Sequence, residues 1–217
     1  MIFTRNTASI LLKLFFTGVA GGILVVAGTL MYLVPGLPSV DQLRDVHLQT
    51  PLKVYASTGE LIGEFGEQRR SPVSFEQIPD HFINAIISAE DDSFFSHGGV
   101  DLKGLLRAAS QIVTTGGIQS GGSTITMQVA RNFFLSLEQT FTRKFNEILL
   151  ALEIEHELSK QEILELYANK IYLGKRAYGV QAAANVYYGT DIGDLSLAQL
   201  AMIAGLPKAP TSSNSIN

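Results

Sequence analysis

The feature that most constrains this chain is an uncharged, apolar run of 21 residues, Leu14–Val34. A helix of that length spans about 31 Å, which matches the hydrocarbon core of a bilayer. Arg5 and Lys13 precede the run, and no acidic residue accompanies them. Because positive charge stays on the cytoplasmic side, we expect a cytoplasmic tail over residues 1–13, a transmembrane helix over 14–34 and a domain on the other side.

A cleaved signal peptide is the alternative interpretation of this run. The apolar region of a signal peptide is usually about 7–15 residues long and leads to a small-x-small cleavage site. Leu14–Val34 is longer, and no clear site of that kind ends it. The sequence therefore favours a retained anchor.

Composition sets the rest of the chain apart from the anchor. The 217 residues include 16 Lys and Arg, 20 Asp and Glu, and no Cys, and all but two of these charges lie after residue 34. The net charge of −4 argues against a nucleic-acid binder that relies on positive charge. The absence of Cys excludes disulfides, thiolate metal sites and cysteine nucleophiles. The residues after 34 are typical of one water-soluble domain.

The pattern of apolar residues predicts a mainly helical domain with one small β-hairpin. Leu52–Ala56 and Leu61–Phe65 are short β-like runs on either side of a Ser-Thr-Gly-Glu turn. A loop with four glycines is expected over Thr114–Gly122. Apolar spacing and capping residues predict helices from Pro79, from Asp101 to about Val113, from Thr124 to about Asn132, from Ser136…Gln139, from Ser159…Glu162, over Gly179–Tyr188, and from Ser196…Gln199 to Gly205.

The first group of candidate functional residues lies in the acidic, aromatic segment Glu90–Asp101. Glu90 continues the apolar stripe of its helix, because Ile83, Ile87 and Glu90 are spaced i, i+4 and i+7. An acid on a core-facing stripe is costly unless it faces a cleft, where it could act as a general base. The alternative is a solvated helix end, and this segment alone does not decide between the two.

The second group is the glycine-led stretch Gly121–Arg131. Its glycines lead into a predicted helix start, where free N–H groups and the helix dipole favour anions. Thr124, Gln128 and Arg131 fall at i, i+4 and i+7 and give one polar face that ends in a cation, which suits a phosphate. The stretch lacks the Gly-Lys-Ser/Thr ending of a P-loop, which disfavours a nucleotide triphosphatase. An ordinary connector followed by a helix is the alternative.

Two cations and an acid form the third group. Arg143 and Lys144 lie four and three residues before Glu147 on one predicted helix, and a solvated, salt-bridged helix face is the alternative.

His97 stands beside two glycines, where a histidine is more often structural. No His, Asp and Glu set has the spacing of a zinc site, so no metal site is predicted. The chain also lacks a Gly-x-Ser-x-Gly elbow, which disfavours a serine acyl-enzyme.

Taken in order, these segments resemble the peptidoglycan glycosyltransferases of family 51, the N-terminal module of class A penicillin-binding proteins. The resemblance covers about Leu52–Pro210. The matching motifs are Glu-Asp-x-x-Phe-x-x-His-x-Gly at Glu90–Gly99, Gly-Gly-Ser-Thr-Ile-Thr-Gln-Gln at Gly121–Gln128, Arg-Lys-x-x-Glu at Arg143–Glu147, Lys-x-x-Ile-Leu-Glu-x-Tyr-x-Asn at Lys160–Asn169, and the tail Gly205–Pro210. Met127 replaces the first Gln of the second motif, and we expect little effect because it lies off the predicted polar face.

The resemblance implies a lysozyme-like, mainly α-helical glycosyltransferase domain over residues 51–210, part of which dips into the membrane. It also implies that the domain polymerises lipid II into β-1,4-linked glycan strands, by inverting transfer from a growing strand on undecaprenyl diphosphate. Glu90 would take the proton of the acceptor hydroxyl, and Glu147 would assist near the donor diphosphate. A divalent cation, Mg²⁺ or Mn²⁺, is an optional participant, and no organic cofactor is expected.

The resemblance further implies a set of substrate-binding residues, namely Asp91, Phe94, His97, Ser123, Thr124, Gln128, Arg131, Arg143 and Lys144. Of these, the three cations and the helix start at Thr124 would neutralise the leaving diphosphate. Because exposed salt bridges contribute little to stability, we expect the loss of one of these cations to leave stability nearly unchanged. Lys103 and Arg107 are the next candidates for this site.

The resemblance also sets the expected surroundings. The chain would be single-pass in the bacterial inner membrane, with its catalytic domain in the periplasm and residues 35–50 as a linker. Lipid II, the glycan strand, the membrane and cell-wall synthesis proteins would be its partners, and nucleic acid would not. We expect residues 211–217 to begin a linker to a transpeptidase domain, with a naturally monofunctional transferase as the alternative.

Two rival functions remain at this stage. A lysozyme-like hydrolase or lytic transglycosylase would share a helical fold and a catalytic glutamate, but the membrane anchor and the cations beside Glu147 favour a diphosphate-lipid donor. A catalytically silent membrane scaffold would need neither Glu90 nor Glu147, and both are present.

Overall fold

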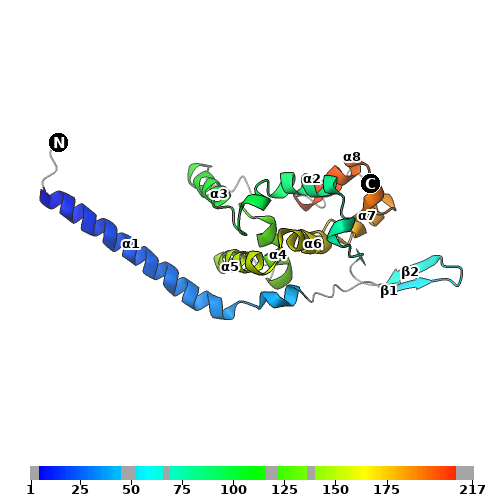
Figure 1. Cartoon of the computed structure of the whole chain (residues 1–217), viewed down its shortest axis with the longest axis horizontal. Helices are drawn as coiled ribbons and strands as arrows, with labels where there is room; N and C mark the ends of the chain where they lie inside the picture. Colours follow the sequence, from blue (N-terminus) through cyan, green and yellow to red (C-terminus); the bar gives the residue numbers. More distant parts are fainter. Residues whose placement is uncertain (1–4, 45–51, 66–68, 116–121, 136–139, 209–217) are drawn as a thin grey trace. The chain divides into compact units, whose positions relative to one another are not determined.

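The computed structural model describes residues 5–44, 52–65, 69–115, 122–135 and 140–208 (Figure 1). The chain divides into two compact units, Met1–Pro38 and Ser39–Asn217. The α-helices are α1 (Arg5–Leu33), α2 (Asp80–Glu90), α3 (Leu102–Thr115), α4 (Ile125–Phe134), α5 (Phe141–Glu157), α6 (Lys160–Lys170), α7 (Val180–Tyr188) and α8 (Leu197–Gly205). The strands are β1 (Leu52–Tyr55), β2 (Leu61–Phe65), β3 (Arg69–Arg70) and β4 (Ala177–Tyr178). The 3₁₀ helices are Val34–Gly36, Val40–Leu43, Phe75–Gln77, Phe94–Ser96, Ile192–Asp194 and Leu206–Lys208.

The first unit consists mainly of α1, a continuous helix of 29 residues. The stretch Leu12–Gly36 has a mean hydropathy of 2.0, and its length and composition are sufficient for a helix that crosses a membrane. The single apolar N-terminal helix predicted from the sequence is therefore confirmed, and it fits a single-pass anchor.

The predicted hairpin is confirmed. Strands β1 and β2 pair antiparallel, with Leu52 opposite Phe65, and the register shifts next to the turn. Gly59 occupies the turn with a φ of +86°, a conformation that favours glycine, and its N–H donates to the carbonyl of Ala56.

A second small sheet was not predicted. Strands β3 and β4 pair in parallel, with Arg70 opposite Tyr178, and the Arg70 guanidinium lies 5.2 Å from the centre of the Tyr178 ring. Each strand has two residues, too few for an alternating pattern, and the two are far apart in the sequence. Only tertiary packing brings them together.

Helix α4 lies at the centre of the helical unit. It packs against both α5 and α6, while α2 packs against α8 (Figure 1). Its apolar residues Ile125, Met127, Val129 and Ala130 are fully buried. The buried position of Met127 explains how the second motif can carry an apolar side chain there. The helix that follows the glycine-rich stretch is therefore a core element that positions the polar residues on its other face.

Local capping sets where most helices begin. Ser159 and Ser196 form the predicted capping boxes of α6 and α8. The predicted start of the long helix at Ser136…Gln139 is wrong. Helix α5 begins at Phe141, and the hydroxyl of Thr140 accepts a hydrogen bond from the N–H of Arg143. Residues 136–139 lie outside the described residues, as do residues 116–121 of the predicted glycine loop.

Candidate active site

Glu90 ends α2 and is held from α4. The side-chain amide of Gln128 donates to Oε2 of Glu90 at 3.0 Å. The other carboxylate oxygen, Oε1, is buried and has no hydrogen-bond partner among the residues that the structure describes. The side chain as a whole is half-buried and lines a pocket. The predicted face of α4 therefore orients Glu90 through Gln128.

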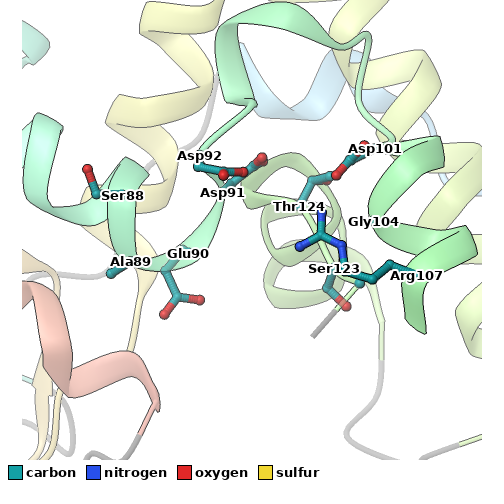
Figure 2. Close-up of a pocket in the computed structure, with 11 residues that line it drawn as sticks. Ser88, Ala89, Glu90, Asp91, Asp92, Asp101, Gly104, Arg107, Ser123 and Thr124 are labelled. Carbon is teal, nitrogen blue, oxygen red and sulfur yellow. The ribbon is translucent and has the colours of Figure 1, made fainter. Parts of the chain in front are cut away.

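The pocket beside Glu90 has a volume of about 160 Å³. Its walls come from the end of α2, the first turns of α3 and the segment that leads into α4. Figure 2 shows Glu90 on one side and the guanidinium of Arg107 reaching in from α3, on the side of Ser123. Asp92 and Asp101 also line the pocket. The pocket is therefore polar, with several carboxylates and one guanidinium in its walls.

Glu147 lies on α5, and only 1% of its surface is exposed. The ammonium group of Lys144 is 2.9 Å from Oε2 of Glu147 and donates a hydrogen bond to it. Nε of Arg143 is 3.4 Å from Oε1, close enough for an ion pair but not aligned for a hydrogen bond, so neither atom has a hydrogen-bond partner in the described structure. The buried carboxylate is thus flanked by two cations.

Lys144 connects the two carboxylate sites. Its ammonium group also donates to the hydroxyl of Ser123 at 2.5 Å, and Ser123 lines the same pocket as Glu90. The third motif therefore reaches the wall of the Glu90 pocket through one side chain. This contact brings together the three groups of residues that the sequence singled out.

Asp91 accepts a hydrogen bond from the N-terminus of α4. Its carboxylate is 3.0 Å from Nε2 of His97, and its Oδ2 also accepts from the backbone N–H of Ile125. The hydroxyl of Thr124 accepts from the N–H of Met127. Two of the free N–H groups at this helix start are therefore satisfied by the protein itself.

The residues around Asp91 are mostly buried as well. The hydroxyl of Thr124 donates to the carbonyl of Gly99 at 2.6 Å, and Phe94 is fully buried. Lys160 of the fourth motif lies 4.2 Å from the centre of the Phe94 ring and donates to the carbonyl of His97. These contacts fasten the first motif to α4 and α6.

Comparison with known proteins places this arrangement in a family. A family model described as transglycosylase matches residues 58–217. The chain belongs to the transglycosylase family. Penicillin-binding protein 1A of Pseudomonas aeruginosa is 63% identical over 198 residues, which are 91% of this chain and 24% of that protein. Penicillin-binding protein 1A of Escherichia coli K12 is 54% identical over 187 residues, 86% of this chain and 22% of that protein.

A solved structure of penicillin-binding protein 1A from Haemophilus influenzae is also similar. It is 31% identical, covers 77% of this chain and 15% of the solved chain, and has a TM-score of 0.37. The present chain spans about a quarter of the length of the curated relatives that it matches.

The transglycosylase structure corrects two expectations about anion binding. The start of α4 at Thr124 does not offer a free set of N–H groups, because Asp91 and Thr124 occupy it. The premise that the ion pairs of Arg143 and Lys144 are exposed is also wrong, since their shared partner Glu147 is buried. Removal of either cation would leave the buried carboxylate of Glu147 with one partner fewer, so the free energy of unfolding should fall.

The predicted substrate-binding residues of the transglycosylase site fall into two sets. Asp91, Phe94 and Thr124 are buried, and with His97 they make contacts that hold segments of the protein together, but Asp91 and Thr124 also line the pocket, so all four stay predicted substrate contacts as well. The remaining five stay predicted substrate contacts: Ser123, Gln128, Arg131, Arg143 and Lys144. Arg107 was predicted only as a further candidate for the diphosphate site, and the structure places it in the pocket wall.

Tyr167 is the tyrosine of the fourth motif, and the sequence predicted no role for it. It is 1% exposed, and burial raises the pKa of its hydroxyl well above the ordinary value. The charge of Glu90 raises this pKa further, and the charge of Arg131 lowers it. Sequence reasoning missed this neighbourhood because the packing of α6 on α4, rather than any spacing along the chain, creates it.

Proposed function

We propose that this transglycosylase domain polymerises lipid II into β-1,4-linked glycan strands and releases undecaprenyl diphosphate. The observation that supports this most directly is the bridge made by Lys144. It joins the buried, cation-flanked Glu147 to Ser123, in the wall of the pocket that Glu90 lines. A carboxylate in the wall of a pocket that is joined in this way to a group of cations suits transfer of a sugar from a diphosphate donor.

In this proposal Glu90 is the general base. The 4-hydroxyl oxygen of the acceptor sugar attacks the anomeric carbon of the donor, and the bond from that carbon to the diphosphate oxygen breaks. The hydroxyl proton passes to Glu90, and the configuration at the anomeric carbon inverts. Gln128 keeps the carboxylate oriented during this step by its hydrogen bond to Oε2.

The cations have a matching task in the proposed reaction. Negative charge grows on the diphosphate as it leaves, and fixed positive groups lower the energy of that state. Lys144 and Arg143 stand in position because the buried carboxylate of Glu147 holds them. Arg131, near the end of α4, adds a third cation on the side of Tyr167. Glu147 thus acts by orienting cations.

The residues described here do not by themselves form a site for a divalent cation. Among them, no group of three or more His, Asp or Glu side chains could hold a metal ion, and the Glu147 carboxylate already has two cationic neighbours. No step of the proposed reaction uses Mg²⁺ or Mn²⁺. The prediction that such a cation participates is tested by polymerisation assays with and without a chelator.

The anchor completes the proposal. Lipid II keeps its lipid in the bilayer, so an enzyme tethered by α1 would meet its substrate in two dimensions. We propose a cytoplasmic N-terminus, because Arg5 and Lys13 precede the apolar run, and a periplasmic domain at the inner membrane. Cell-wall synthesis proteins are the partners we expect for a domain that makes glycan strands.

The decisive experiment incubates the purified chain, in detergent, with labelled lipid II. We expect a ladder of long glycan strands on electrophoresis, and its collapse to small products after treatment with a muramidase. Preformed, uncrosslinked glycan strands serve as the second substrate. Shortening of those strands, without any growth from lipid II, would contradict polymerisation and favour a hydrolase or lytic enzyme. No change in either substrate would favour a silent scaffold.

A further inference from the structure

Tyr167 carries a buried hydroxyl that the proposed chemistry does not yet use. Its side chain is 1% exposed on α6, and the hydroxyl has no hydrogen-bond partner within the described parts of the chain. Burying a hydroxyl without a partner costs free energy, and a phenylalanine would fill nearly the same space without that cost. The hydroxyl therefore calls for a functional explanation.

The surroundings of this hydroxyl contain a matching unpaired acceptor. Oε1 of Glu90 is also buried and lacks a partner in the described structure, while Oε2 is held by Gln128. The charges of Glu90 and Arg131 both act on the Tyr167 hydroxyl. Gln128 and Arg131 belong to α4, and α4 packs directly on α6. An unpaired donor and an unpaired acceptor thus share one neighbourhood.

The protonation state of Tyr167 suits a hydrogen-bond donor. Burial raises the pKa of Tyr167 well above its ordinary value, and the negative charge of Glu90 raises it further. The hydroxyl therefore keeps its proton at neutral pH and can only act as a neutral donor toward a carboxylate.

The other charged groups near Glu90 either line the pocket or are paired with other residues. Asp92, Asp101 and Arg107 line the same pocket as Glu90. Asp91 is engaged with His97 and the start of α4.

We propose that Tyr167 is a positioning residue for Glu90. In the substrate complex its hydroxyl donates a hydrogen bond to the inner oxygen, Oε1, and so fixes the carboxylate with Oε2 toward the acceptor hydroxyl. Tyr167 touches no substrate and acts through Glu90. This inference rests on the proposed polymerisation of lipid II, in which Glu90 is the base.

The test is Tyr167→Phe in the full chain, with lipid II as substrate. A hydrogen bond to a charged group is worth roughly 10–150-fold in equilibrium terms, so we expect kcat to fall by that order while KM stays nearly constant. The melting temperature should stay equal or rise, because the deleted hydroxyl has no partner to lose. The acid side of the pH–rate profile should move to higher pH, because the carboxylate form loses a donor.

Two further variants make the result specific. Tyr187→Phe on α7 is the matched control, since the hydroxyl of Tyr187 donates to the carbonyl of Leu173 at 2.8 Å. It should lower the melting temperature and leave kcat per folded molecule unchanged. The double variant Glu90→Gln with Tyr167→Phe should be no slower than Glu90→Gln alone, because a residue that acts through Glu90 has nothing left to position.

Each outcome decides the matter. The inference is overturned if Tyr167→Phe keeps the wild-type kcat and pH profile, if its activity falls only in proportion to its folded fraction, or if its effect adds fully to that of Glu90→Gln. Wild-type protein that leaves lipid II unchanged would instead remove the proposed function itself. Active wild type with fully active Tyr167→Phe removes only the role of Tyr167.

Discussion

At the scale of single residues, Glu90 is a position where charge matters more than shape. Glu90→Gln keeps the size of the side chain but removes its basicity. We expect polymerisation of lipid II to fall by roughly 10²–10⁴-fold, the usual contribution of a general base, while the melting temperature changes little. Glu153→Gln, an exposed change on α5, is the control and should match wild type in both measurements. Normal turnover by folded Glu90→Gln protein would mean that another group takes the proton.

The ion pairs of Glu147 lead to a second residue-scale prediction. Lys144→Met removes a hydrogen-bonded cation from a buried carboxylate. Because Lys144 itself is partly exposed and Arg143 remains, we expect a loss of about 1–3 kcal/mol in the free energy of unfolding, below the full cost of an unpaired buried charge. Urea unfolding measures this loss.

A rescue variant separates stability from catalysis at the same place. Adding Glu147→Gln to Lys144→Met removes the buried charge that lost its partner, so most of the lost stability should return. Polymerisation should stay low, because the Lys144 cation near the diphosphate is still absent and Arg143 has also lost the carboxylate that orients it. Recovery of full activity together with stability would show that Lys144 serves only to neutralise Glu147.

At the scale of elements, α4 depends on its N-terminal cap. The hydroxyl of Thr124 accepts from the N–H of Met127 and donates to the carbonyl of Gly99, so Thr124→Ala removes both contacts. We expect a loss of about 1–2 kcal/mol in the free energy of unfolding, measured by urea denaturation. Thr114→Ala, at the exposed end of α3, is the control and should cost less than about 0.5 kcal/mol. An equal effect of both changes would contradict the capping role.

The elements also show which parts of the fold could be read from the sequence. The boxes at Ser159 and Ser196 were predictable because Glu162 and Gln199 stand three residues later and complete a local motif. The cap at Thr140 was missed because Arg143 holds that third position and leaves no such signature. Local sequence signals predicted most of the helices. They could not predict the pairing of β3 with β4, because the two strands are far apart in the sequence.

The same limit applies to the candidate site. Spacing along one helix placed Gln128 and Arg131 on a common face, and it placed Lys144 next to Glu147. It could not show that Glu147 is buried, because burial depends on which helix covers α5. Nor could it show the contact of Lys144 with Ser123, which joins segments that lie 21 residues apart.

At the scale of the whole molecule, the anchor and the helical domain form separate compact units. We expect α1 to stay uncleaved and to span the membrane when the chain is produced in a Gram-negative host. Protease added to spheroplasts should digest the domain after Pro35 and leave an N-terminal fragment protected. Mass determination of that fragment measures the boundary.

Two results would contradict this topology. Release of a soluble domain that lacks about 35 N-terminal residues would favour a cleaved signal peptide. Full protection of the domain, lost only when the inner membrane is permeabilised, would place the domain in the cytoplasm.

Gly99 is a position at which any substitution should disturb the folding of the site. Its φ is +90°, and a Cβ atom there would lie 2.5 Å from the backbone oxygen of Ala151 on α5. The loop after Glu90 therefore rests directly on the helix that carries Glu147, with no space for a side chain. In a genetic screen, alleles that replace Gly99 should be temperature-sensitive, because they disturb assembly while every reacting group is still encoded. Purified Gly99→Ala protein should therefore unfold at a lower temperature than wild type, which thermal denaturation measures.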